Sequence, residues 1–253
     1  MLEIKPIPAF NDNYIWLIRE PDSNEAWVVD PGDAAPVQKA LEKDGLTLAG
    51  ILVTHHHYDH TDGIDELKKA WSVKAWGADN QHTDIVCAEN DTVAVCGYEF
   101  RTLAVPGHTL DHVAFYNEET STLFCGDTLF LGGCGRIFEG TADQMHHSLQ
   151  KLAVLPDDTQ VYCTHEYSLA NLKFAQAVEP DNHYVLQAVT RANQLRAENK
   201  PTLPTTIADE KCHNPFFRSH QPAVIASATE QKGTLVVAPA EVFAAIRQWK
   251  DNF

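Results

Sequence analysis

The stretch Thr54-His55-His56-His57-Tyr58-Asp59-His60 follows the apolar run Ile51-Leu52-Val53, and it decides both the fold class and the chemistry of this chain. Side chains along an extended strand alternate between two faces, so His55 and His57 point to one side and His56 points to the other. Asp59 and His60 come where the chain must turn, and they can face a second point in space. The stretch therefore predicts a binuclear metal centre with one pair of ligands for each ion.

A histidine-rich run can also be a solvated loop, but three further apolar runs of this chain end in a residue of metal-ligand type. They are Leu103–Gly107 before His108, Leu123–Gly126 before Asp127, and Val161–Thr164 before His165. Short runs of β-branched and aromatic residues bounded by turn residues are typical of buried strands. Ligands of open α/β sheets bind beyond the carboxyl ends of the strands, and here four predicted strands each deliver a candidate ligand.

The candidate ligands carry imidazole and carboxylate groups and no thiolate: His55, His57, Asp59, His60, His108, Asp127 and His165. This donor set suits zinc, iron or manganese and disfavours a cysteine-rich structural zinc site. The two carboxylate oxygens of Asp127 can bridge two ions, whereas each imidazole serves one. Two ions about 3.5–4 Å apart can share a hydroxide formed near neutral pH and polarise a carbonyl or phosphoryl oxygen.

Histidines outside these stretches are predicted to have structural or surface positions. His82, His183, His213 and His220 are expected at the surface or in loops, and His56 is expected to be packed or hydrogen-bonded away from its two neighbours. None of them has a second ligand at a useful spacing.

Composition favours a cytoplasmic protein that acts on small molecules. The 253 residues suffice for an α/β domain with a small addition, and no apolar run approaches the roughly 20 residues that span a bilayer. The first residues lack the basic region and apolar core of a signal peptide. Residues 1–166 carry a net charge of −17 and residues 167–253 carry +1, which together give −16, and an acidic surface disfavours a nucleic-acid partner. The six cysteines include no CxxC pair, which indicates reduced thiols rather than a disulfide framework.

The predicted boundary between two domains falls near residue 167. Before it, strand-like and helix-like segments alternate, with a strand over 26–29 and helices over 36–43 and 64–71. Thr141 and Gln144 form a capping box for a helix with Met145, Leu149 and Leu152 on its inner face. After the boundary the strand signal fades, and helices are predicted over 168–178 with Ser168 as the cap, over 186–195, and over 239–251 with a proline in the first turn.

Four short motifs contain the candidate ligands: HxHxDH at 55–60, Gly107-His108-Thr109, Gly126-Asp127-Thr128 and Thr164-His165-Glu166-Tyr167. Together they resemble the metallo-β-lactamase superfamily. A longer string, GDTLFLGGCGRIFEGT at 126–141, is accompanied by NLKFA at 171–175, NPFFR at 214–218 and the terminal Arg247…Lys250-Asp251-Asn252-Phe253. These features resemble, more narrowly, the glyoxalase II (hydroxyacylglutathione hydrolase) family, and the resemblance spans the whole chain.

The resemblance implies an αββα sandwich in residues 1–166, with the metals at one edge of its two sheets, and a mainly helical glutathione-binding domain in residues 167–253. It implies two divalent ions, zinc first among the candidates with iron or manganese as alternatives. By the family pattern the first ion takes His55, His57 and His108, the second takes Asp59, His60 and His165, and Asp127 bridges them.

The resemblance also implies the reaction. The family hydrolyses S-D-lactoylglutathione and related S-(2-hydroxyacyl)glutathione thioesters to a 2-hydroxy acid and glutathione, the second step of methylglyoxal detoxification. A hydroxide shared by the ions would attack the thioester carbonyl, and Asp59 would steer its proton. A thiol has a pKa of about 8.5, so the sulfur can leave as thiolate without a dedicated general acid.

Glutathione brings carboxylates, and Arg247 and Lys250 lie three residues apart on a predicted helix and hence on one face. By the family pattern this pair binds the glycine carboxylate, while Arg136, Phe138 and Tyr167 contact the tripeptide. The alternative for the pair is a basic helix end that complements the helix dipole. The chain departs from the family pattern at Phe138, where some relatives carry tyrosine, and at Asp62, where glycine is usual.

Three alternatives share this fold: a persulfide dioxygenase, another hydrolase such as a β-lactamase or lactonase, and a non-enzymatic interaction protein. The first usually lacks the NPFxR motif and the terminal Arg-x-x-Lys. Class B β-lactamases tend to place cysteine where Asp127 lies, and non-enzymatic relatives typically lose ligands. We therefore expect a cytoplasmic thioester hydrolase that is a monomer, with a small-molecule glutathione thioester as its partner and neither nucleic acid nor membrane.

Overall fold

The computed structural model describes residues 2–253, which fold into two compact units. The first unit comprises the chain up to Ala104 together with Asp111–Gly126, and the second comprises Val105–Leu110 together with Asp127–Phe253. The chain thus crosses between the units three times. The domain boundary expected near residue 167 follows the change from strand to helix along the sequence, and it stays a prediction.

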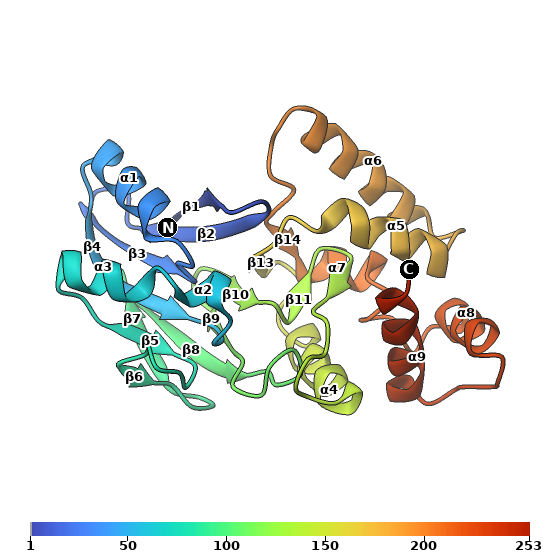
Figure 1. Cartoon of the computed structure of the whole chain (residues 1–253). Helices are drawn as coiled ribbons and strands as arrows, with labels where there is room; N and C mark the ends of the chain where they lie inside the picture. The colour runs from blue at the N-terminus through green and yellow to red at the C-terminus, as the bar shows by residue number, and fades with distance from the viewer. Residues whose placement is uncertain (1) are drawn as a thin grey trace. The chain divides into compact units, whose positions relative to one another are not determined.

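The first sheet of the first unit has its strands in chain order (Figure 1). They are β1 (Glu3–Ala9), β2 (Asn13–Arg19), β3 (Glu25–Val29), β4 (Thr47–Val53), β5 (Ala75–Gly77) and β6 (Ile85–Val86). The first two pairings are antiparallel, and from β3 onward neighbouring strands run parallel. Parallel strands are joined by crossovers, and helices α1 (Ala34–Asp44) and α3 (Ile64–Trp71) supply two of them. The strand expected over 26–29 and both helices expected here are confirmed.

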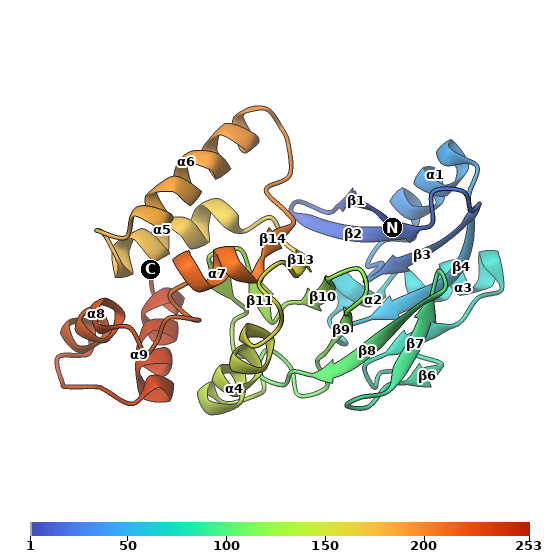
Figure 2. The ribbon, with the colours of Figure 1, turned by 180° about the vertical axis from the view of Figure 1, so that it is seen from behind.

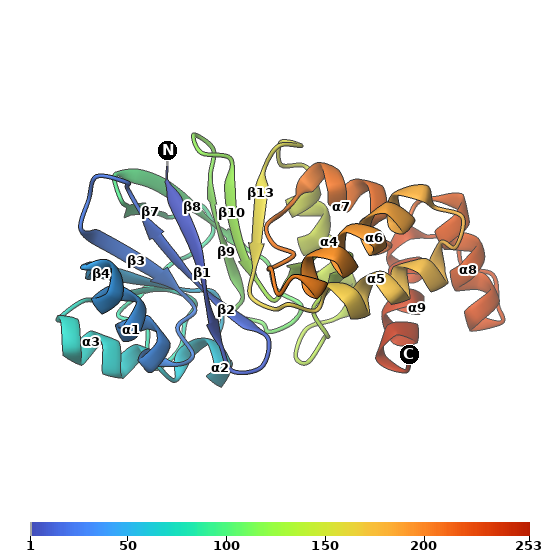
Figure 3. The same ribbon diagram turned by 90° about the horizontal axis from the view of Figure 1, so that it is seen from above.

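One face of this sheet packs under α1 and α3, as Figure 3 shows. Alternate strand residues such as Ile15, Val28 and Ile51 share a buried cluster with Val37 of α1 and Leu67 of α3. Asp33 caps the start of helix α1, and its side chain accepts from the Ala35 backbone N–H at 3.0 Å. Gly45 caps the end of the helix and adopts the left-handed conformation at φ 66°. Burial of the apolar helix faces is the main stabilising term of this layer.

The opposite face of the sheet is apolar as well, because Trp16, Ile18 and Val29 are also buried. Four antiparallel strands of the second sheet lie in this unit: β7 (Thr92–Val95), β8 (Tyr98–Ala104), β9 (Val113–Asn117) and β10 (Thr122–Gly126). The Cys96 thiol of the β7–β8 turn lies 3.7 Å from the Ile18 carbonyl of the first sheet. Every residue of β9 and β10 is buried, which explains their continuous apolar sequence.

The second unit is mainly helical and also holds two small strand pairs, β11 (Leu129–Phe130) with β12 (Gly133–Cys134) and β13 (Gln160–Cys163) with β14 (Thr205–Thr206). Its helices are α4 (Ala142–Ala153), α5 (Ser168–Val178), α6 (His183–Ala197), α7 (Ile207–His213), α8 (Pro222–Lys232) and α9 (Pro239–Asp251). Figure 2 shows α5 beside α6 and α8 beside α9. The sequence did not reveal α7 or α8.

Helix starts of the second unit test the expected caps. Thr141 caps α4 through both hydrogen bonds of a capping box, with Met145, Leu149 and Leu152 buried beneath, as predicted. Ser168 is wrong as a cap: it is the first residue of α5, and its hydroxyl lies 2.6 Å from that of Thr202. The hydroxyl is buried against another hydroxyl and therefore does not reach the helix N–H groups.

The cysteines form no disulfide among residues 2–253, as expected for reduced thiols. Within that part of the chain, no helix combines the length and apolar character needed to cross a membrane.

Candidate metal centre

The strand end before the histidine stretch is held by Asp30. Its carboxylate accepts from the Thr54 backbone N–H and from the Thr54 hydroxyl, both at 2.7 Å. The Thr54 hydroxyl in turn lies 3.1 Å from Nδ1 of His55. These contacts fix the imidazole that follows the strand, and His55 is completely buried.

The alternation expected for the histidine stretch is confirmed. Nε2 of His55 lies 3.1 Å from Nδ1 of His57, so the two rings meet on one side. His56 points away, and its Nδ1 lies 2.9 Å from the Asp111 carboxylate. His112, which is outside the predicted ligand set, stacks on His55 with ring centroids 4.7 Å apart.

Asp59 and His60 lie in the short helix α2 (Tyr58–Thr61), where the chain turns. Nδ1 of the buried His60 lies 3.0 Å from the Asp30 carboxylate, and its Nε2 lies 3.5 Å from the Asp59 carboxylate. Asn13 donates to that same Asp59 oxygen at 3.0 Å. A carboxylate on one ring nitrogen fixes the tautomer and raises the basicity of the other, which is how histidine ligands of metals are commonly held.

Asp30 is a functional residue that sequence reasoning missed. The sequence predicted a strand over 26–29 and no role for the residue after it, yet Asp30 adopts φ 53° and contacts both Thr54 and His60. A left-handed backbone at a buried aspartate is unusual and marks a position that the surroundings hold in place. The only feature of the sequence that could have indicated this role is a carboxylate directly after a predicted strand.

The departure at Asp62 leaves the turn intact. Asp62 is exposed and has φ −62°, so no left-handed conformation is required of it. The adjacent Gly63 carries the constraint, because a Cβ there would lie 2.5 Å from the Pro31 carbonyl oxygen.

A second set of ligand types, His108, Asp127 and His165, comes together inside the second unit. Nε2 of His108 and Nε2 of His165 lie 3.5 and 3.3 Å from the same Asp127 oxygen. Nδ1 of His108 lies 2.7 Å from the Arg136 carbonyl oxygen, which selects the Nδ1–H tautomer and directs Nε2 toward the carboxylate. All three side chains are buried.

Both sets fit divalent metal by their chemistry. Each set offers imidazole nitrogens beside a carboxylate, and the second nitrogen of His60 and of His108 is held by an acceptor. No cysteine takes part in these contacts, which disfavours the thiolate-rich structural zinc class. The distances of 3.3–3.5 Å between Nε2 and carboxylate oxygens are long for strong hydrogen bonds.

Two residues expected to contact the tripeptide lie directly on the second set. The Tyr167 ring stacks on His165 with centroids 4.6 Å apart and an interplanar angle of 1°. Phe138 meets His108 edge-on at 5.3 Å and is 61% exposed. Both therefore present an aromatic surface next to the ligands of their unit.

Arg247 is more deeply embedded than a solvated helix end. It is 7% exposed, donates to the Cys134 carbonyl oxygen at 2.9 Å and pairs with Asp251 at 3.0 Å. Arg136 pairs with the same Asp251 oxygen at 3.1 Å. The Asp251 carboxylate thus draws two guanidinium groups together at the end of α9.

Lys250 is half-buried beside this cluster. Its ammonium group donates to the Ala170 carbonyl oxygen at 3.1 Å and lies over the rings of Phe174 and Phe253. Burial lowers the pKa of Lys250, and the nearby charge of Arg247 adds to that effect. A partly desolvated cation gains more from an anionic ligand than a fully hydrated one does.

Glu210 and Asn214 hold the β11–β12 hairpin that follows Asp127. The buried Glu210 carboxylate accepts from the Gly132 backbone N–H at 2.9 Å and from the Asn214 amide at 2.8 Å. The Asn214 amide also donates to the Gly133 carbonyl oxygen at 2.9 Å. The NPFFR string thus contributes to the geometry of the hairpin, although nothing in the sequence assigned this part to Asn214.

His213 was expected at the surface or in a loop, and this expectation is wrong. It is 6% exposed, and its Nε2 lies 3.1 Å from Oε1 of Glu210. Burial lowers the pKa of His213, but the charge and hydrogen bond of Glu210 outweigh it, so the net pKa is raised. A raised pKa adds stability that is present below the ordinary pKa of about 6.5 and is lost as the pH rises through the folded value.

We expect Glu210→Gln to impair turnover through the hairpin. Glutamine has one acceptor oxygen, so either the Gly132 and Asn214 donors or the Thr205 and His213 groups lose their acceptor. A misplacement of about 1 Å near reacting groups can cost on the order of 100-fold. A drop in kcat of about 10-fold or more is expected, measured well below the unfolding temperature.

The matched control is Glu179→Gln, which breaks the equally buried pair of Glu179 with Arg218 at 2.8 and 2.9 Å, away from the hairpin. Both variants should lose about 1–3 kcal/mol of stability for each donor left unsatisfied. Equal losses of kcat in the two variants would mean that Glu210 has no role beyond stability.

Asp30→Asn should weaken metal binding without removing a ligand. Asparagine can still accept from Thr54, but it cannot serve as the anionic partner of the His60 ring. Loss of such an outer partner typically costs about 10–100-fold in metal affinity or activity. Competition with a chromophoric chelator measures the affinity directly, and an unchanged value would contradict this role of Asp30.

Comparison with known proteins decides the family. Residues 9–85 and 99–165 match the model of the metallo-β-lactamase superfamily, and residues 166–253 match the model for the hydroxyacylglutathione hydrolase C-terminus. Hydroxyacylglutathione hydrolases of Chromohalobacter salexigens and Pseudomonas fluorescens are 53% and 50% identical over 257 residues, with 100% of each chain covered. The chain belongs to the hydroxyacylglutathione hydrolase family.

Among solved structures, ETHE1 from Myxococcus xanthus is similar to this chain with a TM-score of 0.66 and 25% identity, covering 99% of this chain and 98% of the other. The metallo-β-lactamase fold with a helical C-terminal region, predicted from the sequence, is confirmed. The match to the superfamily model ends at residue 165 and the match to the C-terminal model begins at residue 166, next to the predicted domain boundary. The two compact units instead divide after Ala104, Leu110 and Gly126.

Proposed function

We propose that this protein hydrolyses S-D-lactoylglutathione and related S-(2-hydroxyacyl)glutathione thioesters to a 2-hydroxy acid and glutathione, the second step of methylglyoxal detoxification. The observation that carries the proposal is the sequence identity of 50–53% to hydroxyacylglutathione hydrolases over the full length of the chain. The matches to both family models agree with it. The protein is therefore a thioester hydrolase, and the dioxygenase and lactamase alternatives are not favoured.

The protein binds divalent metal through its histidine and aspartate clusters. We propose two ions per chain, zinc before iron or manganese, with His55, His57 and His108 on the first and Asp59, His60 and His165 on the second. Asp127 would bridge them, and its contacts with both His108 and His165 support this role. When bound, such ions lower the pKa of a shared water and polarise the thioester carbonyl.

The side chains of this protein would orient the reaction. Asp59, held by Asn13 at 3.0 Å, would accept and steer the proton of the attacking water. His60 would keep its orientation through Asp30. The sulfur needs no proton donor, because a thiol with a pKa of about 8.5 leaves readily as thiolate.

We propose that Arg136, Phe138, Tyr167, Arg247 and Lys250 bind the tripeptide, and that residues 167–253 form the glutathione-binding domain beside a catalytic domain of residues 1–166. The aromatic surfaces of Phe138 and Tyr167 lie against ligand histidines of their own unit. Arg136 and Arg247 share Asp251, and a substrate carboxylate would compete for the same guanidinium groups. We also propose a cytoplasmic monomer, since free thiols suit a reducing compartment.

One assay tests the proposed function. Hydrolysis of S-D-lactoylglutathione by the purified protein is followed while metals are quantified in the same sample. Thioester cleavage with divalent metal present supports the proposal. Oxygen consumption with a glutathione persulfide, and no cleavage of the thioester, would instead favour a persulfide dioxygenase.

Lys250→Ala should raise KM for glutathione thioesters by about 10-fold and leave kcat nearly unchanged, because binding made equally in ground and transition states affects KM alone. Lys232→Ala on α8 removes a comparable charge in the same unit and should change neither value. Cleavage of a simple thioester without the glycine carboxylate should be indifferent to Lys250→Ala. Equal losses on both substrates would assign Lys250 to the fold.

Alanine is not a suitable replacement for Arg247, because this side chain is buried and hydrogen-bonded to Cys134 and Asp251. Arg247→Ala would leave the Cys134 carbonyl oxygen and Asp251 without their donor and would cost stability as well as binding. Arg247→Lys keeps the charge and loses the planar fork, so it separates charge from bidentate geometry. A KM increase at unchanged melting temperature is the expected result.

A further inference from the structure

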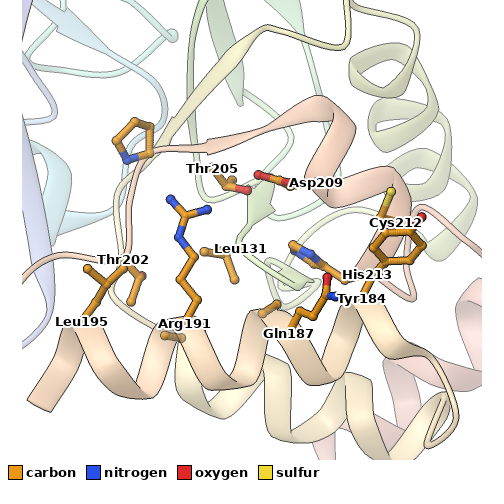
Figure 4. Close-up of a pocket in the computed structure, with 13 residues that line it drawn as sticks. Leu131, Tyr184, Gln187, Arg191, Leu195, Thr202, Thr205, Asp209, Cys212 and His213 are labelled. Carbon is orange, nitrogen blue, oxygen red and sulfur yellow. The ribbon is translucent and has the colours of Figure 1, made fainter.

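A pocket of about 200 Å³ lies in the second unit between α6 and the segment that runs from Thr202 through α7 (Figure 4). The α6 side chains that line it include Tyr184, Gln187, Arg191 and Leu195, which recur at intervals of three or four and so share one face of the helix. The face that α6 turns toward the pocket therefore mixes polar and apolar side chains. Only Val185 and Ala192 of the helix are buried.

Two opposite charges face this pocket from opposite walls. Figure 4 shows Arg191 extending from α6 toward Thr205, and Asp209 of α7 lying beside Thr205 on the far side. Within residues 2–253, neither the Arg191 guanidinium nor the Asp209 carboxylate takes part in any ion pair or side-chain hydrogen bond. A cation and an anion that share a small space without meeting can each accept a complementary group.

Three other polar side chains of the lining, Thr202, Thr205 and His213, already have partners. The Thr202 hydroxyl donates to Glu166 at 2.6 Å and the Thr205 hydroxyl to Glu210 at 2.8 Å. His213 lies against the same Glu210. Leu131, Ala192 and Leu195 add apolar surface. Tyr184 and Gln187 add a hydroxyl and an amide from α6. The charged groups open to a ligand are therefore Arg191 and Asp209, and the apolar part of the wall suits a small aliphatic group.

We propose that this pocket binds a small α-ammonium carboxylate, with its carboxylate on Arg191, its ammonium group on Asp209 and a short aliphatic side chain against Leu131 and Leu195. A guanidinium recognises a carboxylate by two parallel hydrogen bonds. A simple anion would be repelled by Asp209 and a simple cation by Arg191, so the pair together selects a zwitterion. The volume suits one amino acid and is below the roughly 300 Å³ at which pockets for larger ligands begin.

This site is separate from the proposed tripeptide contacts. None of Arg136, Phe138, Tyr167, Arg247 and Lys250 lines the pocket. The inference therefore does not rest on the proposed function, and binding can be measured without turnover.

The test is a titration of the ¹⁵N-labelled, metal-loaded full chain followed by amide chemical shifts. L-leucine should shift the amides of Gln187, Arg191 and Asp209, with a dissociation constant in the millimolar range. N-acetyl-L-leucine lacks the ammonium group and L-leucinamide lacks the carboxylate, so each should bind at least 10-fold more weakly. No shifts at these amides up to the solubility limit of leucine, or equal binding of all three compounds, would overturn the proposal.

Variants localise the binding. Arg191→Ala and Asp209→Asn should each weaken leucine binding at least 10-fold, whereas Lys232→Ala and Asp181→Asn remove the same charges outside the pocket and should not. Loss of binding in the outside pair as well would mean non-specific association and would contradict the site. The γ-glutamyl end of glutathione carries the same group, and a parallel titration with glutathione tells which source the pocket prefers.

Discussion

Asp127→Asn will abolish hydrolysis of S-D-lactoylglutathione and remove at least one metal ion from the protein. An amide has a single acceptor oxygen and no charge, so it cannot link two cations or attract two imidazole-bound ions as the carboxylate does. Replacing even an outer partner of a ligand costs about 10–100-fold, and loss of a bridging ligand should exceed about 100-fold in kcat/KM. The contacts of Asp127 with both His108 and His165 make this the residue with the largest expected effect.

Metal content and activity have to be measured together on this variant. Asp84→Asn is the matched control, because Asp84 accepts from the Ala75 backbone N–H at 2.8 Å and contacts none of the ligands. It should retain full metal and full turnover. An Asp127→Asn protein with a normal metal content and near-normal turnover would exclude the bridging role.

His60→Gln should deplete one metal ion and leave the other. Glutamine can still donate to Asp30, so the buried carboxylate keeps a partner and the fold is preserved, but the imidazole nitrogen beside Asp59 is lost. His55, His57 and His108 would still hold the first ion. Activity should fall about 100-fold or more, since both ions are needed to activate the water and polarise the carbonyl.

Elemental analysis after dialysis against zinc gives the stoichiometry. Wild type should hold two ions, and His60→Gln one. His146→Gln removes a half-buried imidazole that contacts Ser219 and no ligand, and it should behave as wild type. A wild-type protein that takes up only one ion after supplementation would refute the binuclear centre.

Local patterns in the sequence predicted several strands and helices of this protein and the orientation of its clustered histidines. The apolar run before His55 predicted β4, the capping box predicted the start of α4, and Pro239 predicted the start of α9. Alternation along a strand placed His55 and His57 together and His56 apart. These features depend on residues only a few positions apart, and such neighbours can be read directly from the sequence.

Other features depend on residues far apart in the sequence, and the tertiary structure alone decided them. Asp30 serves Thr54 and His60 only because β3 and β4 pair in parallel, which places the two strand ends side by side. Glu210 meets Gly132 across 78 positions of the chain.

The same limit applies to the terminal helix and to the pocket. The spacing of Arg247 and Lys250 placed both on one face, but the depth of Arg247 came from its contact with Cys134, which a helical pattern cannot express. Arg191 and Asp209 look like ordinary surface charges until α6 and α7 bring them to one pocket. Short-range order is encoded by neighbouring residues, whereas burial and charge pairing depend on long-range packing that no local pattern contains.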